Sequence, residues 1–178
     1  MTTYCSVIGL VFLVLTNLAI IITYATPYWL EHRMGWNHGL WARCRSDSCT
    51  WLFQENYKIM TNSNVESEWW IATIALTSLG LIFALFSLLL ATIALCCECR
   101  RCNPSVVIGV LLFMAFLCLS VAAVVFGVCS NKYDNAGIHY TISSGVRFGW
   151  SFWLDVAAAG LALLTSLIYC LVGRGKSA

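Results

Sequence analysis

Two features of this chain could do chemistry: a group of closely spaced cysteines, and one carboxylate within an apolar stretch. Four of the ten cysteines stand close together: Cys96, Cys97, Cys99 and Cys102. Cysteines at the end of a membrane helix are typical substrates for S-palmitoylation, and an acyl chain would pin that segment to the bilayer. Cys99 and Cys102 also have zinc-ligand spacing, but a structural zinc site needs four ligands. The pattern favours palmitoylation over unmodified thiols, and favours a metal site least.

Asp155 is the one charged residue inside an apolar stretch, residues 151–172. An intramembrane carboxylate is by default a functional candidate, so an ion-coordinating or partner-contacting role is one hypothesis. A structural role is the other, because a helix N-terminus favours an anion, a site at headgroup depth is partly wet, and Arg147 could pair with it.

No catalytic constellation accompanies these residues. His32, His38 and His139 are scattered over two loops without a matched nucleophile, and loop histidines are more often solvated than metal-bound. We therefore expect no enzyme, no cofactor and no metal site.

Four apolar stretches must position these side chains: residues 6–25, 69–95, 106–128 and 151–172. About 20 mostly apolar residues span a bilayer as a helix. Only 10% of the residues are charged, against about 25% in a soluble domain. Barrel strands would alternate apolar and polar residues, and a signal peptide would have a basic region before a shorter apolar run. The sequence predicts four membrane helices and contact with lipid, and the net charge of +2 gives no reason to expect a nucleic-acid partner.

Basic residues predict the orientation. Arg100 and Arg101 lie between the second and third stretches, and Arg174 and Lys176 follow the fourth. Short cytoplasmic segments carry the excess of Lys and Arg. We therefore expect residues 96–105 and both termini to be cytosolic in a multi-pass plasma-membrane protein. Residues 28–68 and 129–150 would then be extracellular.

The first extracellular loop contains two cysteines near each other, Cys44 and Cys49. Polar turn residues lie between them, and strand-forming residues follow at 50–53. This favours a β-hairpin stapled by a disulfide with a gain of about 2 kcal/mol. Two free thiols are the alternative.

Trp29, then Gly39-Leu40-Trp41, then Cys44 and Cys49 resemble the W–GLW–C–C signature of the claudin superfamily. That group includes claudins, peripheral myelin and epithelial membrane proteins, and auxiliary subunits of calcium channels and AMPA-type glutamate receptors. The resemblance covers the whole chain, and residues 148–152 (Phe-Gly-Trp-Ser-Phe) are similar to the start of the fourth helix in this group. The spacing between the two cysteines is shorter than in claudins, and the arginine that claudins usually carry before the second helix is missing.

The resemblance implies an all-α membrane fold, a four-helix transmembrane bundle with a small extracellular antiparallel β-sheet, as a single domain. Trp29, Gly39, Leu40 and Trp41 would anchor the sheet at the membrane surface, and Cys44 and Cys49 would form the disulfide.

Two functions are compatible with this resemblance. The first is a cell-junction or membrane-organising protein, which assembles with itself or related tetraspans in cis and in trans and could form a paracellular barrier at cell–cell contacts. Charged loop residues would then select ions, with Glu55, Lys58, Glu66 and Glu68 as candidates. The second is an auxiliary subunit that alters the trafficking or gating of a channel or receptor.

Overall fold

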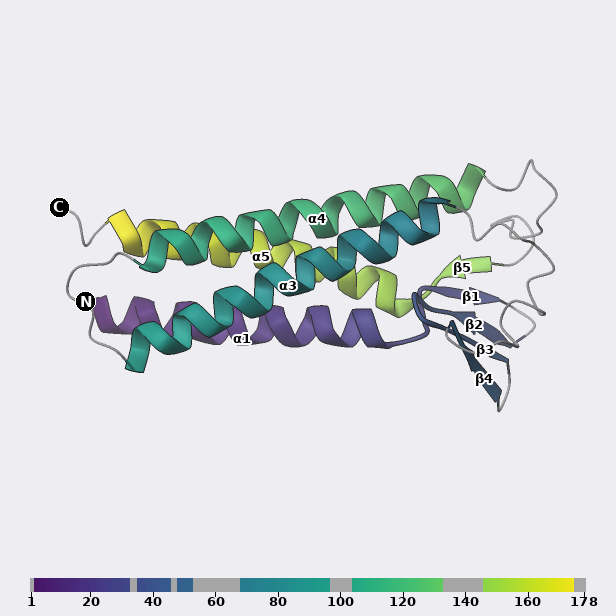
Figure 1. The fold of residues 1–178 in the computed structure, drawn as a ribbon, viewed down its shortest axis with the longest axis horizontal. Coiled ribbons are helices and arrows are strands. Elements are labelled where there is room, and N and C mark those ends of the chain that lie inside the picture. The colour runs from purple at the N-terminus through teal and green to yellow at the C-terminus, as the bar shows by residue number, and fades with distance from the viewer. Residues whose placement is uncertain are drawn as a thin grey trace.

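Four long helices dominate the computed structural model, which describes residues 2–32, 35–45, 48–52, 68–96, 104–132 and 146–174. They are α1 (Thr2–Ala25), α3 (Glu68–Cys96), α4 (Pro104–Lys132) and α5 (Trp150–Arg174). The helices run side by side along the long axis, with a small sheet at one end (Figure 1). We call this the sheet end. The opposite end, where α1 begins and α5 ends, is the terminal end.

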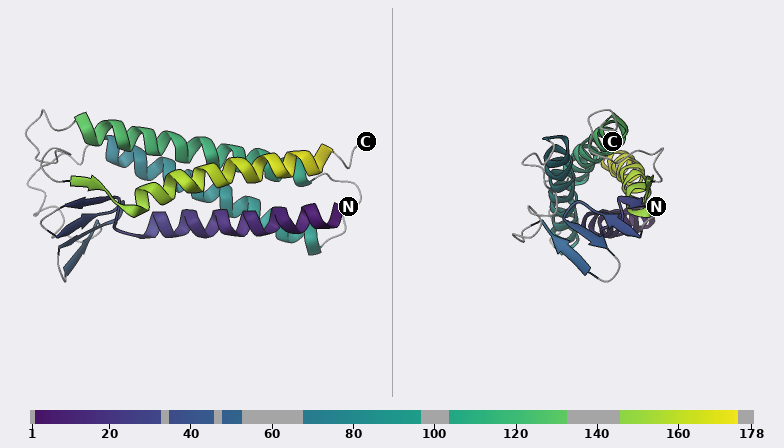
Figure 2. Two further views of the ribbon diagram at one scale, coloured as in Figure 1. Left: turned by 180° about the vertical axis from the view of Figure 1, so that it is seen from behind. Right: turned by 90° about the vertical axis from the view of Figure 1, so that its right-hand side faces the viewer.

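The helices form a ring in which successive helices are neighbours and the first and last helices also pack together. α4 packs along both α3 and α5, and α1 packs mainly on α5 with a smaller contact to α3. The end-on view in Figure 2 shows this arrangement. The last helix of the chain therefore closes the bundle against the first.

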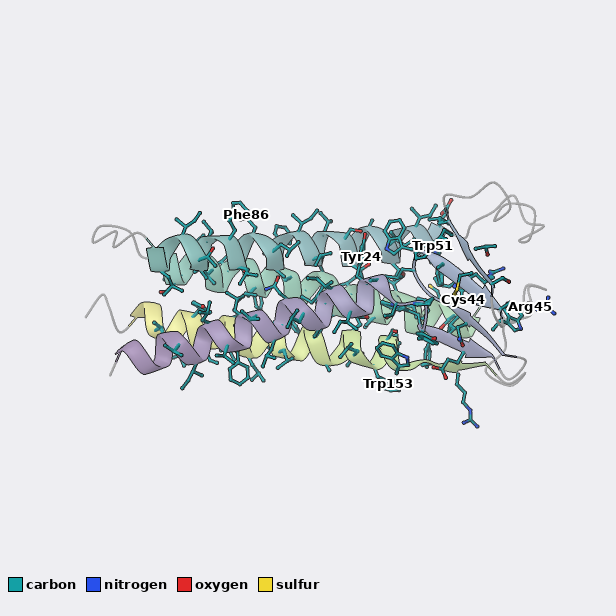
Figure 3. The ribbon with its side chains drawn as sticks, turned by 90° about the horizontal axis from the view of Figure 1, so that it is seen from below. Tyr24, Cys44, Arg45, Trp51, Phe86 and Trp153 are labelled. Carbon is teal, nitrogen blue, oxygen red and sulfur yellow. A yellow bond between two sulfur atoms is a disulfide. The ribbon has the colours of Figure 1, made fainter. Side chains whose placement is uncertain are left out.

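The outer faces of the helices are apolar and open. Val124 is 63% exposed and Leu171 is 68% exposed. Phe86 and Trp153 point away from the bundle in Figure 3. Apolar surface on this scale is not stable in water, and all four helices are long and apolar enough to cross a bilayer. The chain is a multi-pass membrane protein whose helices contact lipid.

The inner faces combine small, apolar and hydroxyl residues. Ala84, Ala115 and Ala158 are fully buried in one cluster with Leu119. Buried hydroxyls mostly donate to a carbonyl one turn earlier, as Thr77 does to Thr73 at 2.7 Å. Hydroxyl groups are thereby satisfied without water, which the interior of a membrane bundle requires.

The sheet has five strands in the order β4-β3-β2-β1-β5, and every neighbouring pair is antiparallel. Four strands follow α1: β1 (Leu30–His32), β2 (Trp36–His38), β3 (Ala42–Arg45) and β4 (Ser48–Trp51). The fifth, β5 (Val146–Phe148), directly precedes α5 and pairs with β1. The predicted four-helix bundle with a small antiparallel sheet is confirmed.

Candidate functional site: the junction of sheet and bundle

The disulfide expected in the first loop is confirmed: Cys44 and Cys49 are bonded and lie directly opposite each other on β3 and β4. Leu52 N donates to Trp41 O at 2.8 Å. Ladder hydrogen bonds alternate along an antiparallel pair, so the cysteines occupy a non-hydrogen-bonded pair, where side chains are closest. The bond therefore closes the outer hairpin at a site where little backbone adjustment is needed.

Trp29 lies where helix, sheet and the start of α5 meet. Its side chain is fully buried, and its indole Nε1 donates to Thr23 O at 2.9 Å. The ring meets Phe126 edge-to-face at 4.9 Å and Phe152 at 6.0 Å. Its backbone N donates to His38 O at 3.1 Å. One tryptophan thus touches α1, α4, α5 and β2.

Gly39 is required by close approach of two backbones. A Cβ added at this position would collide with Pro27, and it would lie 2.8 Å from Thr26 O. The next residue, Leu40, is buried in the same aromatic cluster as Trp29. Trp41 is half-buried and meets Tyr24 of α1 edge-to-face at 5.4 Å. The Gly-Leu-Trp run therefore lays the β2–β3 connection directly on the end of α1.

A second glycine makes the corresponding contact from the other side. A Cβ on Gly149 would collide with the carbonyl oxygen of Tyr28 and lie 2.8 Å from its carbonyl carbon. Gly149 N donates to Trp29 O at 2.9 Å, and Ser151 N donates to Tyr28 O at 3.1 Å. Thr23 Oγ1 donates to Ser151 O at 2.7 Å. The start of α5 is thus hydrogen-bonded to the chain leaving α1. We call the contact zone of Trp29, Gly39, Gly149 and Ser151 the sheet–bundle junction.

His38 contributes to this zone in a way that sequence reasoning missed. Its ring lies 4.2 Å from the Trp70 ring, edge-to-face, and Nδ1 is buried without a hydrogen-bond partner in the described residues. Burial, together with the nearby Arg43 guanidinium, holds the pKa of His38 well below its ordinary value of 6.5. His38 is therefore a neutral packing residue, whereas the sequence suggested a solvated loop histidine. The sequence signal that could have indicated this burial is the position of His38 directly before Gly39 of the Gly-Leu-Trp motif.

Asp155 is more buried than the sequence suggested. Its side chain is 0% exposed, and neither carboxylate oxygen has a hydrogen-bond partner in the part of the chain that the structure describes. Arg147, the expected partner, lies on β5 with an exposed side chain. The expected pairing and partly wet site are wrong, because Asp155 points into the bundle, whereas Arg147 belongs to the sheet.

The remaining candidates lie largely outside the described residues. Cys96 is the last residue of α3, and its side chain, together with Cys97, Cys99 and Cys102, is not described. The same is true of Glu55, Lys58 and Glu66, whereas Glu68 begins α3 with an exposed side chain. In the ranges that are described, no group of three or more His, Cys, Asp or Glu residues could hold a metal ion.

Comparisons with known proteins agree with this architecture. The chain is 27% identical over 162 residues to a zebrafish (Danio rerio) protein described as "p53 apoptosis effector related to PMP-22", covering 89% of this chain and 78% of the relative. A family model, described as PMP-22/EMP/MP20/Claudin family, matches residues 4–169. This match includes all five described strands, the whole of α3 and α4, and most of α1 and α5. The chain belongs to the PMP-22/EMP/MP20/Claudin family, a family of structural membrane proteins.

Proposed function

We propose that the sheet end faces the outside of the cell and that both termini are cytosolic at the plasma membrane. Two observations support this orientation. α3 ends, α4 begins and α5 ends at the terminal end (Figure 1), and in the sequence these helix ends are followed or joined by the basic residues that the positive-inside rule expects on a cytosolic face. The Cys44–Cys49 disulfide lies at the sheet end, and disulfides persist in oxidising compartments.

On that orientation, we propose that the protein organises cell–cell contacts by lateral assembly with itself or related tetraspans, as a claudin-like adhesion or barrier component. The observation that carries the proposal is the outer edge of the sheet. Among the described strands β4 lies at one edge of the sheet, Trp51 on it is 47% exposed, and Arg45 projects at the far end of the sheet (Figure 3). Edge strands present backbone donors and acceptors to a second chain.

The sheet–bundle junction gives this edge a fixed position. Trp29, Gly39 and Gly149 bring the sheet into direct contact with the ends of α1 and α5. An edge that is held rigidly above the membrane can repeat the same contact along a row of molecules. If the sheet were loosely tethered, each contact would also have to order the sheet, and that loss of conformational entropy would weaken the assembly.

The test is expression in adhesion-deficient epithelial cells, followed by imaging and transepithelial resistance. Enrichment at contacts with a changed resistance or ion preference is expected. Even plasma-membrane distribution with unchanged resistance would refute the barrier role and would direct attention to pull-downs of a channel or receptor partner.

A matched pair of variants tests the edge itself. Trp51→Ala removes the exposed ring on β4, whereas Trp51→Phe keeps an aromatic ring at the same position. Loss of contact enrichment in Trp51→Ala with retention in Trp51→Phe is expected for an aromatic contact through β4. Unchanged enrichment in both variants refutes assembly through the Trp51 side chain.

A role in apoptosis is a second candidate, supported by the description of the zebrafish relative. Cell death on induced expression, scored against the Gly149→Ala variant described below, tests it. Equal viability with and without expression would exclude this role.

A further inference from the structure

The sheet is held to the bundle by two sets of contacts that differ in their chemistry. On the side of α1 and α5 the contacts include hydrogen bonds between backbone groups, such as that from Gly149 N to Trp29 O at 2.9 Å. On the side of α3, the ring of His38 on β2 meets the ring of Trp70 edge-to-face, with 4.2 Å between the ring centres. Mild acid leaves backbone amides unchanged but adds a proton to an imidazole. Of these two sets, the second can therefore respond to acid.

The nitrogen atoms at this contact suit a neutral imidazole. Nδ1 of His38 is buried without a hydrogen-bond partner among the described residues, and the same is true of Nε1 of Trp70, which is an N–H donor. A neutral imidazole can present one nitrogen as an acceptor to such a donor, whereas a protonated ring carries an N–H on both nitrogens. Protonation would therefore place two unsatisfied donors in one buried contact, and each of them costs free energy.

Arg43 adds a second positive charge beside His38. The two residues lie directly opposite each other on β3 and β2, so their side chains share one face of the sheet. Burial and the Arg43 guanidinium together hold the pKa of His38 well below 6.5, although a hydrogen bond with the backbone of Gly39 acts in the other direction. A proton on His38 is thus disfavoured as long as the ring stays in contact with α3.

The described acidic groups nearby do not provide a buried counterion for His38. Glu31 on β1 follows the residue that pairs with His38, so strand alternation directs it to the other face of the sheet, opposite Arg147. Glu68 at the start of α3 has an exposed side chain. α4 contributes Phe126 to this cluster, which does not titrate.

We propose that His38 is an acid-sensitive switch between the sheet and α3: when its ring gains a proton, β2 separates from Trp70 while the sheet stays attached to α1 and α5. The released ring binds its proton more readily than the buried one, so falling pH favours release. Each unit by which contact with α3 lowers the pKa of His38 favours the released state by up to about tenfold in acid. The junction is closed at neutral pH and opens as the pH falls below 6.5 toward the lowered pKa.

The consequence for cell contacts rests on the proposed function. A sheet that is no longer fixed against α3 would lose the defined position that repeated assembly needs. Contacts would then weaken once the protein enters an acidified vesicle. The conformational change belongs to the single molecule, so it can be measured without assembly and judged separately from the proposed function.

The experiment measures acrylamide quenching of tryptophan fluorescence in the purified full-length protein, held in nanodiscs of neutral lipid between about pH 7.5 and 5. Trp70 is 6% exposed, so its separation from the sheet should open it to the quencher. His38→Phe keeps an aromatic ring without a titrating group, and His38→Asn removes the ring. His32→Gln and His139→Gln are matched controls, because they remove the other two histidines of the chain. Circular dichroism reports whether the helices stay intact.

In the wild type and in both controls, quenching should increase reversibly below about pH 6.5, with unchanged helix content. His38→Phe and His38→Asn should show quenching that does not change with pH, and Trp70→Phe should show a smaller increase because the reporter is gone. If neither His38 variant folds, the wild type and the two controls decide, since they leave His38 as the one histidine that every responding protein shares. The proposal is overturned by a wild type without the increase, by an increase that persists in a folded His38 variant, by its loss in either control, or by loss of helix along with it.

Discussion

Gly149→Ala is the sharpest test of the junction, because one methyl group is added where two backbones touch. The new Cβ would meet the carbonyl group of Tyr28, with its carbon 2.8 Å away. No side-chain rotation can relieve this contact, since the atoms are backbone. The α5 start would have to move away from α1, which weakens the hydrogen bonds from Gly149 N to Trp29 O and from Ser151 N to Tyr28 O.

We expect Gly149→Ala to lower the free energy of unfolding by about 3 kcal/mol, because the added methyl group overpacks a site whose neighbours cannot move aside. For a chain of this size that lowers the melting temperature by roughly 6 to 12 °C. Gly160→Ala is the matched control, because Gly160 lies in the middle of α5 with nothing within 4 Å of its added Cβ. There, alanine removes the helix penalty of glycine and should stabilise by about 0.5 to 1 kcal/mol.

The assay is thermal unfolding in detergent, followed by tryptophan fluorescence, together with delivery of each variant to the cell surface. Gly149→Ala should unfold earlier and reach the surface poorly, whereas Gly160→Ala should do neither. Equal melting temperatures for Gly149→Ala and wild type would refute the close approach of Gly149 to Tyr28.

Three further perturbations probe the same end of the molecule. Trp29→Ala should lower the free energy of unfolding by about 3 to 5 kcal/mol, because Trp29 is fully buried. Trp153→Ala, at a 60% exposed lipid-facing site, should lower it by less than about 1 kcal/mol. Equal losses for the two variants in urea unfolding would argue against the central position of Trp29. Replacing both Cys44 and Cys49 by serine should cost about 2 kcal/mol and make unfolding insensitive to reductant, and a reductant effect that persists would contradict the pairing. His38 binds its proton less readily when folded than when unfolded, because its pKa lies below 6.5 in the folded state, so its contribution to stability is present above pH 6.5 and is lost as pH falls toward that lowered pKa. Thermal unfolding of the wild type should therefore shift downward in acid more than that of His38→Asn, and parallel pH profiles would rule out this effect.

The helices were predictable from sequence because the bilayer imposes a length and a composition that few other structures satisfy. α3 covers the predicted residues 69–95 and starts at Glu68, whose charge suits a helix N-terminus. α1 begins at Thr2, ahead of the predicted residue 6, because a helix can continue past the end of its apolar run. Apolar content therefore predicts the minimum length of each helix but not the residues at which the helix begins and ends.

The junction could be predicted only in part. The motif residues suggested where the sheet meets the membrane, but the pairing of β5 with β1 joins residues more than a hundred positions apart, and no local pattern encodes it. The same limit explains Asp155 and His38. Whether a polar side chain is solvated or buried depends on which distant elements cover it, and position in the sequence does not reveal this.

The connection of β1 to α1 and of β5 to α5 has a mechanical consequence. These two strands lie side by side, and each of them is directly connected to a membrane helix (Figure 1). A pull on the sheet away from the bundle would pass into α1 and α5 together, along strands that run close to the long axis. Hydrogen bonds loaded in this direction are sheared as a group instead of being opened one after another. The antiparallel pair thus distributes tension over two helices that are also hydrogen-bonded to each other at Thr23 and Ser151.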